Sequence, residues 1–81
     1  MKYITYVLKD ENGLLYKGVT NNINRRLKEH QSGHTVTTSR MKNIKVVYTE
    51  EFTTFQEARK RELYFKSSAG RRFIKSRVMP L

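Results

Sequence analysis

The sequence predicts an α+β fold: a single domain over residues 1–81, built from a small three-stranded, mostly antiparallel sheet flanked by about three helices. Three observations lead to this prediction. β-branched and aromatic residues gather in three short segments, as they do in strands. The first two of these segments are separated by Asn12-Gly13, a strong hairpin signal. Two other segments combine a polar N-cap residue with apolar residues at helical spacing, which favours helices.

The predicted strands are Tyr3–Leu8, Leu14–Val19 and Ile44–Phe52. Because the hairpin pairs the first two, Tyr6 and Tyr16 are expected to lie near each other on the sheet. Tyrosines in strands are most often packing partners, and that role is assigned to Tyr3 and Tyr48.

The first helix is predicted from about Asn22 to Gln31. The Asn22 side chain is suited to accept the free amide protons of the first turn. Gly33 supplies the left-handed residue that commonly ends a helix. Ile23 and Leu27, four residues apart, form the stripe expected to face the core.

The second helix is predicted from Thr54 to about Ser67, with Thr54 and Glu57 in the pattern of a capping box. We expect Ser68-Ala69-Gly70 to end it and Arg71–Arg77 to form one or two further basic helical turns over the core. The residues at helical spacing on its expected inward face are Phe55, Ala58, Glu62, Phe65 and Ala69.

The composition points to a polyanionic partner. Lys and Arg number 17 against 7 Asp and Glu, which gives a formal net charge of +10. Nucleic acid is the first candidate, ahead of an acidic membrane surface and of a merely lysine-rich solvated face. The chain has no cysteine, which excludes disulfides and thiolate zinc sites. Because it shows neither a signal-peptide pattern nor a membrane span, the expected location is cytoplasmic.

Residues 34–43 lack apolar periodicity and are predicted to form a loop. Short hydroxyl side chains beside Arg and Lys suit contacts with a phosphate backbone, although a plain solvated connector fits equally well. The residues predicted to contact nucleic acid are Lys17, Arg25, Thr37, Ser39, Arg40, Lys42, Lys66, Arg71 and Arg72.

A candidate site lies where the second strand passes into the first helix. Tyr16 is near the end of the strand, and Arg26 and His30 share one helix face because they are four residues apart. A phenol, a guanidinium and an imidazole are therefore expected to converge. These groups could act as a base, a phosphate clamp and a second proton carrier.

Glu62 is a second candidate because it falls on the inward face of its helix. An acidic side chain on an apolar stripe is costly unless it is paired or coordinated. One explanation is an ion pair with an arginine or with Lys66, four residues on. The other is a divalent metal, since Mg²⁺ commonly binds one or two carboxylates and completes its shell with water and phosphate oxygens.

In this order, the motifs resemble those of the GIY-YIG nuclease domain. Thr5-Tyr6-Val7 stands at the first motif and Tyr16-Lys17-Gly18 at the second. Arg26 and His30 match the helix that follows, and Glu62 matches the glutamate of the later helix. The resemblance covers nearly the whole chain and implies a GIY-YIG-like fold.

The resemblance also implies a metal-dependent endonuclease that hydrolyses phosphodiester bonds. In that reading Tyr6 or Tyr16 deprotonates the attacking water, and His30 helps one phenol to lose its proton. Arg26 holds the scissile phosphate, and Glu62 binds Mg²⁺ or Mn²⁺, which stabilises the departing 3′ oxygen.

Departures from the family pattern keep a second function open, that of a nucleic-acid-binding module with weak or no catalysis. Ile4 stands where the first motif has glycine, and Thr5 replaces its isoleucine. Lys17 replaces an apolar residue, and the asparagine that many members carry after the glutamate helix has no clear counterpart in residues 67–75.

The expected partner is DNA, with structured or branched DNA and repair intermediates among the substrates that such nucleases cut. The sequence leaves open the choice between DNA and RNA. Specificity is expected from the loop over residues 34–43, from a homodimer, or from a separate recognition partner.

Overall fold

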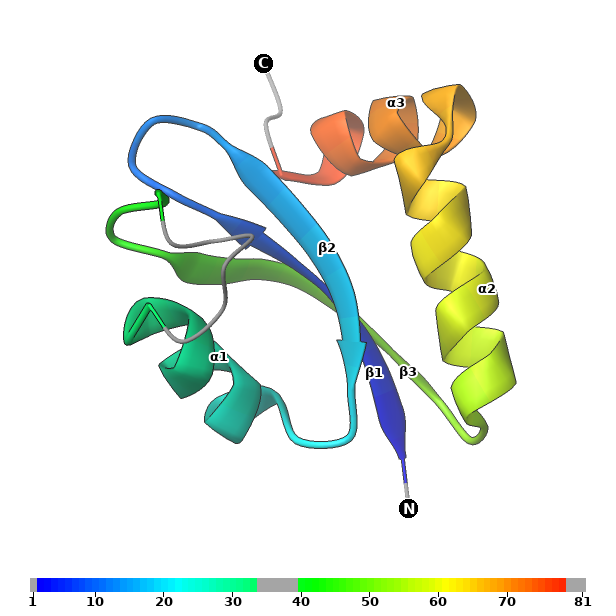
Figure 1. Cartoon of the computed structure of the whole chain (residues 1–81). Helices are drawn as coiled ribbons and strands as arrows, with labels where there is room; N and C mark the ends of the chain where they lie inside the picture. The colour runs from blue at the N-terminus through cyan, green and yellow to red at the C-terminus, as the bar shows by residue number, and fades with distance from the viewer. Residues whose placement is uncertain (1, 34–39, 79–81) are drawn as a thin grey trace.

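The chain folds into a three-stranded antiparallel sheet with helices on both faces (Figure 1). A computed structural model describes residues 2–33 and 40–78. In chain order the elements are β1 (Tyr3–Lys9), β2 (Leu15–Thr20), α1 (Ile23–Gln31), β3 (Lys45–Phe52), α2 (Phe55–Lys66) and α3 (Ser68–Val78). The predicted α+β fold class is confirmed, and both strand pairs are antiparallel.

The strands are ordered β2-β1-β3, so β1 lies in the middle and β2 forms one edge. Tyr6 is directly opposite Gly18, and Leu8 is opposite Tyr16. Tyr6 and Tyr16 are therefore diagonal neighbours on one face, with ring centroids 6.2 Å apart. The hairpin prediction, which placed these two tyrosines together, is confirmed.

Alternation along the strands sends side chains into two core layers. The layer on the α1 face is built on Tyr6, Leu8 and Ile44. Ile23 and Leu27 of α1 pack against it, as their four-residue spacing predicted. The other layer, under α2 and α3, contains Val7, Phe65 and Ile74.

The ends of α1 follow the local signals in the sequence. The Asn22 side chain accepts a hydrogen bond from the Arg25 amide at 3.0 Å, and Gly33 adopts a φ of 75°. Likewise, the Thr54 hydroxyl accepts from the Glu57 amide at 3.2 Å and so caps α2. The carboxylate of Glu57 accepts from the hydroxyls of Thr53 and Thr54.

The predicted end of the second helix is wrong in one respect. The helix ends at Lys66, close to the predicted end, but Ser68-Ala69-Gly70 do not form a stop: they are the first residues of α3, which also contains the predicted helical turns of Arg71–Arg77. The reason is the side chain of Ser67, whose hydroxyl accepts from the Gly70 amide at 3.1 Å and starts the new helix. Gly70 is buried at this corner, where any Cβ would collide with the carbonyl of Tyr64.

The predicted inward stripe of α2 is also only partly correct. Ala58, Glu62 and Phe65 are buried. Phe55, in contrast, is 48% exposed and packs edge-on against Tyr3, and Ala69 is exposed because the chain turns before it.

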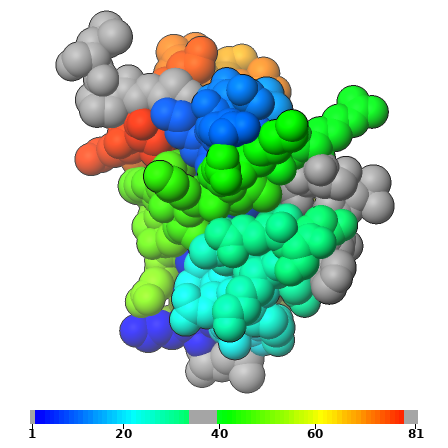
Figure 2. Space-filling view, turned by 90° about the vertical axis from the view of Figure 1, so that its left-hand side faces the viewer, coloured from blue at the N-terminus to red at the C-terminus, as the bar shows by residue number. Residues whose placement is uncertain are grey.

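The tip of the β1–β2 hairpin is fastened to the segment before β3. The buried carboxylate of Asp10 accepts from the amides of Asn12, Leu14 and Lys42 at 3.0, 2.8 and 3.3 Å. The Glu11 amide donates to the carbonyl of Lys42. Figure 2 shows the hairpin tip and this segment side by side above α1. Burial acts to raise the pKa of Asp10, but the three amide donors together hold it below its usual range.

Candidate active site

Three elements bring the predicted tyrosines, arginine and histidine together on the α1 face of the sheet. Tyr6 comes from β1, Tyr16 from β2, and Arg26 and His30 from α1. The ring of His30 lies 5.9 Å from that of Tyr6 and 4.8 Å from that of Tyr16, measured between centroids. The convergence predicted from the strand-to-helix spacing is therefore present in the structure.

Gly18 makes this convergence possible. A Cβ at this position would lie 2.5 Å from Tyr6 Oη and 3.1 Å from Tyr16 Cε1. Contacts between unbonded heavy atoms normally lie at about 3.5–4.0 Å. The bare backbone of Gly18 therefore lets the Tyr6 phenol lie across the edge strand, beside Tyr16.

Tyr6 and His30 form a buried pair. A hydrogen bond of 2.9 Å joins Tyr6 Oη to His30 Nε2, and each residue is 1% exposed. Burial raises the pKa of Tyr6 to about 12, against the lowering effect of a hydrogen bond from Arg26. Burial, followed by the positive charge of Arg26, lowers the pKa of His30 below its ordinary value of 6.5. At neutral pH the pair therefore consists of a protonated phenol and a neutral imidazole.

Arg26 is the positive charge of the site. It hydrogen-bonds to Tyr6, to Glu29 and to Tyr16, and these contacts, with that to Tyr6 the strongest, raise its pKa further. Its Nη1 lies 3.1 Å from Glu29 Oε1. The side chain is 32% exposed, so the guanidinium touches both phenols while remaining accessible to an anion.

Glu62 belongs to α2, on the other face of the sheet from α1. Its negative charge is one of the influences that raise the pKa of Tyr6. Its side chain is only 10% exposed, and both carboxylate oxygens are ion-paired: Oε1 with Arg59 Nη1 at 2.6 Å, Oε2 with Lys66 Nζ at 3.1 Å. The ion-pair explanation for this inward acid is thus realised, with two partners from its own helix.

The donor set near Glu62 limits how a metal could be held. Within residues 2–33 and 40–78, no three side chains among His, Cys, Asp and Glu come together as a ligand cluster. A divalent ion at Glu62 would depend on water and phosphate oxygens for most of its ligands, a pattern that Mg²⁺ tolerates well. The carboxylate therefore fits a metal in chemical type, provided that an ion pair opens.

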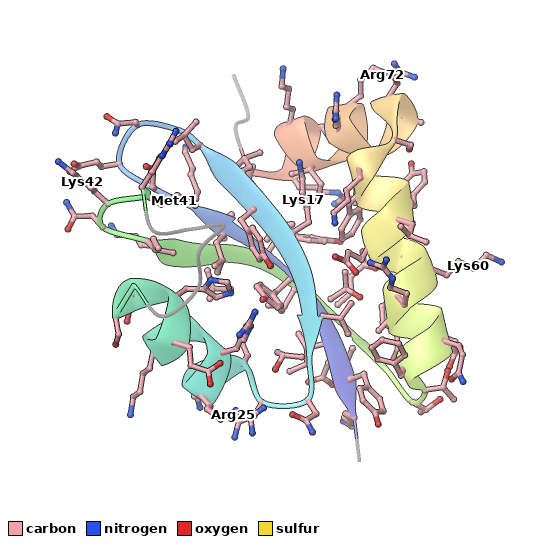
Figure 3. All side chains as sticks on the ribbon, in the orientation of Figure 1. Lys17, Arg25, Met41, Lys42, Lys60 and Arg72 are labelled. Atoms are coloured by element: carbon pink, nitrogen blue, oxygen red, sulfur yellow. The ribbon has the colours of Figure 1, made fainter. Side chains whose placement is uncertain are left out.

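The predicted nucleic-acid contacts separate into a cluster and scattered positions. Lys17 extends from β2 toward α2 and α3 (Figure 3). Burial, then the neighbouring charges of Arg71 and Lys66, lower the pKa of Lys17. These three cations, which we call the basic cluster, lie on the opposite face of the sheet from Arg26.

The other predicted contacts that Figure 3 labels lie away from the basic cluster. Arg25 is at the start of α1, Lys42 lies beyond the hairpin tip, and Arg72 points outward from α3. Arg40 is exposed, while Thr37 and Ser39 fall outside the described residues. The predicted contacts thus do not form a single patch, and their role in binding stays a prediction.

Sequence reasoning missed three contributors. Arg59 is the closer partner of Glu62, and its position three residues before Glu62 was a usable signal. The hydroxyl of Thr5, which replaces an apolar residue of the family motif, donates to the carbonyl of Ala58 at 2.8 Å and ties β1 to α2. Gly18 leaves room for the ring of Tyr6, but this role depends on the register of the strands, so no local sequence pattern predicts it.

The comparison with protein families establishes the family of this chain. The model of the GIY-YIG catalytic domain matches residues 2–75. The chain belongs to the GIY-YIG family. It is therefore a member of a nuclease family, as the resemblance of its motifs implied.

Its relatives carry the name UPF0213. A UPF0213 protein of Bacillus licheniformis is 45% identical over 62 residues, which are 75% of this chain and 64% of that protein. One from Clostridium perfringens is 40% identical over 67 residues, which are 82% of this chain and 71% of that protein. The match thus spans slightly less than two thirds of the first of these GIY-YIG relatives.

A solved structure has the same fold. The solution NMR structure of a UPF0213 protein from Bacillus halodurans matches with a TM-score of 0.58 and 27% identity. The match covers 99% of this chain and 89% of that one. Across the part of the chain that the structure describes, no helix is long and apolar enough to cross a membrane.

Proposed function

We propose that this GIY-YIG chain is a metal-dependent endonuclease that hydrolyses phosphodiester bonds in DNA. The observation that carries the proposal is the convergence of two phenols, a guanidinium and a neutral imidazole around Gly18. The carboxylate of Glu62 acts on Tyr6 electrostatically from α2. These groups match the needs of phosphodiester hydrolysis: a base for water, a charge for the phosphate and an anchor for a cation.

Exposure separates the roles of the two tyrosines. Tyr6 is buried, its hydroxyl is bonded to His30, and its raised pKa opposes ionisation. Tyr16 is only partly buried, and its hydroxyl receives a hydrogen bond from Arg26. In this proposal Tyr16 acts as the base that takes the proton of the attacking water, and the hydrogen bond from Arg26 holds its oxygen in place. Tyr6 and His30 hold Arg26 and Tyr16 in position.

Arg26 binds the scissile phosphate. A guanidinium can donate two parallel hydrogen bonds to non-bridging phosphate oxygens and balance the charge that grows in the transition state. Its ion pair with Glu29 is on the surface and worth at most about 1 kcal/mol. An incoming phosphate can therefore displace Glu29 without a large penalty.

Glu62 is the proposed metal ligand. When bound, Mg²⁺ or Mn²⁺ supplies positive charge that stabilises the departing 3′ oxygen. The burial of Glu62 restricts its carboxylate, and the ion pairs with Arg59 and Lys66 hold both of its oxygens in place before the cation arrives.

DNA is the proposed partner because of the formal charge of +10 and the basic cluster. Each phosphate neutralised on duplex DNA adds about −0.9 to the slope of log K against log salt. Binding is therefore expected to weaken steeply with salt.

The test is cleavage of end-labelled duplex, branched and single-stranded DNA and of RNA, in Mg²⁺, Mn²⁺ or EDTA. Arg26→Gln is expected to lower the rate by roughly 10²- to 10³-fold. Tyr16→Phe is expected to lower it by roughly 10²- to 10⁴-fold. The matched controls are Lys28→Gln, which removes an equal charge from an exposed position of α1, and Tyr64→Phe, an exposed tyrosine of α2.

The competing function is DNA binding without catalysis. The raised pKa of Tyr6 and the doubly ion-paired Glu62 are the observations that favour it. Salt-sensitive DNA binding with no cleavage of any substrate in either metal would establish that function and reject the nuclease.

A further inference from the structure

The carboxylate proposed to hold the metal has no unbonded oxygen. Arg59 occupies Oε1 and Lys66 occupies Oε2, at 2.6 and 3.1 Å. A divalent ion therefore competes with two cations that belong to the same helix. This competition is a property of α2, because the three residues lie at i, i+3 and i+7.

The three side chains differ in their freedom to move. Glu62 is 10% exposed, while Arg59 and Lys66 are 48% and 50% exposed. Both cations can turn into water at little cost, whereas the carboxylate cannot leave its buried position. Opening of the site therefore means departure of a cation.

Lys66 is the cation set to leave first. Its contact with Glu62 is the longer of the two, and its ammonium is a compact, strongly hydrated charge on a flexible stem. It also belongs to the basic cluster, in which like charges repel one another. A phosphate bound at the basic cluster relieves that repulsion and attracts Lys66 in competition with Glu62.

We propose that Arg59 and Lys66 close Glu62 to divalent cations in the free protein, and that a DNA phosphate opens it by drawing Lys66 away. This inference rests on the proposed function, since it takes Glu62 as the metal ligand. Its consequence is that metal and DNA strengthen each other's binding. By thermodynamic linkage, DNA raises the affinity for metal by the same factor by which metal raises the affinity for DNA.

The test measures Mn²⁺ binding directly, from the electron paramagnetic resonance signal of free Mn²⁺. Lys66→Gln and Arg59→Gln are each expected to bind Mn²⁺ roughly fivefold tighter than the parent, because each removes one competing ion pair. The matched control is Lys60→Gln, which removes an equal charge from the outward face of α2 (Figure 3). Lys60→Gln is expected to change the affinity less than about twofold, and Glu62→Gln to abolish this binding.

The effect of DNA is measured with a short duplex in a Tyr16→Phe background, which lacks the proposed base but keeps every charge. The duplex is expected to tighten Mn²⁺ binding clearly when Lys66 is present and much less in Lys66→Gln. Thermal unfolding in Mn²⁺ provides a second measurement, since a ligand that binds the folded state raises the melting temperature.

The inference is overturned if Lys66→Gln and Arg59→Gln bind Mn²⁺ no tighter than Lys60→Gln. The nuclease proposal survives that result if Glu62→Gln still abolishes Mg²⁺-dependent cleavage. If Glu62→Gln binds Mn²⁺ as tightly as the parent, Glu62 is not the metal ligand. Both the inference and the proposed metal role then fail.

Discussion

Gly18→Ala is expected to damage the site and the fold together. The added methyl would lie 2.5 Å from Tyr6 Oη and 2.7 Å from Tyr6 Cζ. Relief requires the Tyr6 ring to move by about 1 Å, since carbon atoms in contact are normally about 3.5–4.0 Å apart. Tyr6 is 1% exposed and bonded to His30, so the ring has no free space to enter.

The size of the effect follows from two costs. Overpacking a filled core typically costs about 1–3 kcal/mol. Breaking the hydrogen bond between Tyr6 and His30 adds about 0.5–1.5 kcal/mol. The expected loss in the free energy of unfolding is therefore about 2–4 kcal/mol, which in a domain of this size lowers the melting temperature by roughly 10–30 °C.

The assays are urea and thermal unfolding, together with cleavage at a temperature where the variant is folded. Displacing the phenols and Arg26 by about 1 Å is expected to lower the cleavage rate by about 10²-fold. Gly33→Ala is the control, because a Cβ there meets nothing within 4 Å and only the φ of +75° is strained. It is expected to cost about 1–2 kcal/mol and to leave cleavage unchanged.

A double variant tests the stated cause. Adding Tyr6→Phe to Gly18→Ala removes the atom nearest to the new methyl and should restore roughly 1 kcal/mol relative to additive losses. A Gly18→Ala protein that unfolds and cleaves like the parent would show that Tyr6 does not lie over Gly18 as described.

Three further predictions concern polar side chains that can carry charge. Asp10 has a lowered pKa in the folded protein, so its stabilising effect is present above its ordinary pKa of 3.8 and is lost as pH falls through the folded value. Asp10→Asn should lower the urea midpoint of unfolding at pH 7 and make that midpoint depend less on pH below 4. A variant whose midpoint falls with acid as steeply as that of the parent would contradict this. Burial lowers the pKa of His30 from 6.5, so parent stability should fall as pH drops below 6.5. His30→Gln should remove that slope between pH 6.5 and 5 in the same titration. Arg61 holds Glu50 through two contacts of 2.8 and 3.2 Å and stacks 4.7 Å from the ring of Tyr64, so Arg61→Lys should cost about 1–2 kcal/mol by thermal unfolding. A melting temperature equal to that of the parent would show that the forked contact contributes nothing.

Local sequence signals were sufficient to predict the elements and most of the chemical groups of the site. Asn12-Gly13 joins two β-rich segments, and Asn22 and Thr54 begin the helices, as their side chains predicted. These signals are local: each depends on the backbone within a few residues, so tertiary contacts did not need to be known. The spacing of Arg26 and His30 likewise fixed their shared helix face.

Local signals were insufficient where two distant segments touch. Ser68-Ala69-Gly70 has the composition of a helix end, yet it begins α3, because Ser67 caps the new helix and Gly70 fits against Tyr64. Phe55 follows the helical period of α2 but lies on the surface beside Tyr3. Periodicity identifies a face of a helix, but not how far along its length the sheet extends beneath it.

The construction of the candidate site depends on contacts between segments that are distant in the sequence. The pairing of Tyr6 with Gly18 is a matter of strand register, and that pairing determines which phenol is buried and which is partly open. The two ion pairs of Glu62 were compatible with its helix spacing, but so was a free carboxylate. Burial decided between them, because a carboxylate withdrawn from water is stable only with compensating charge.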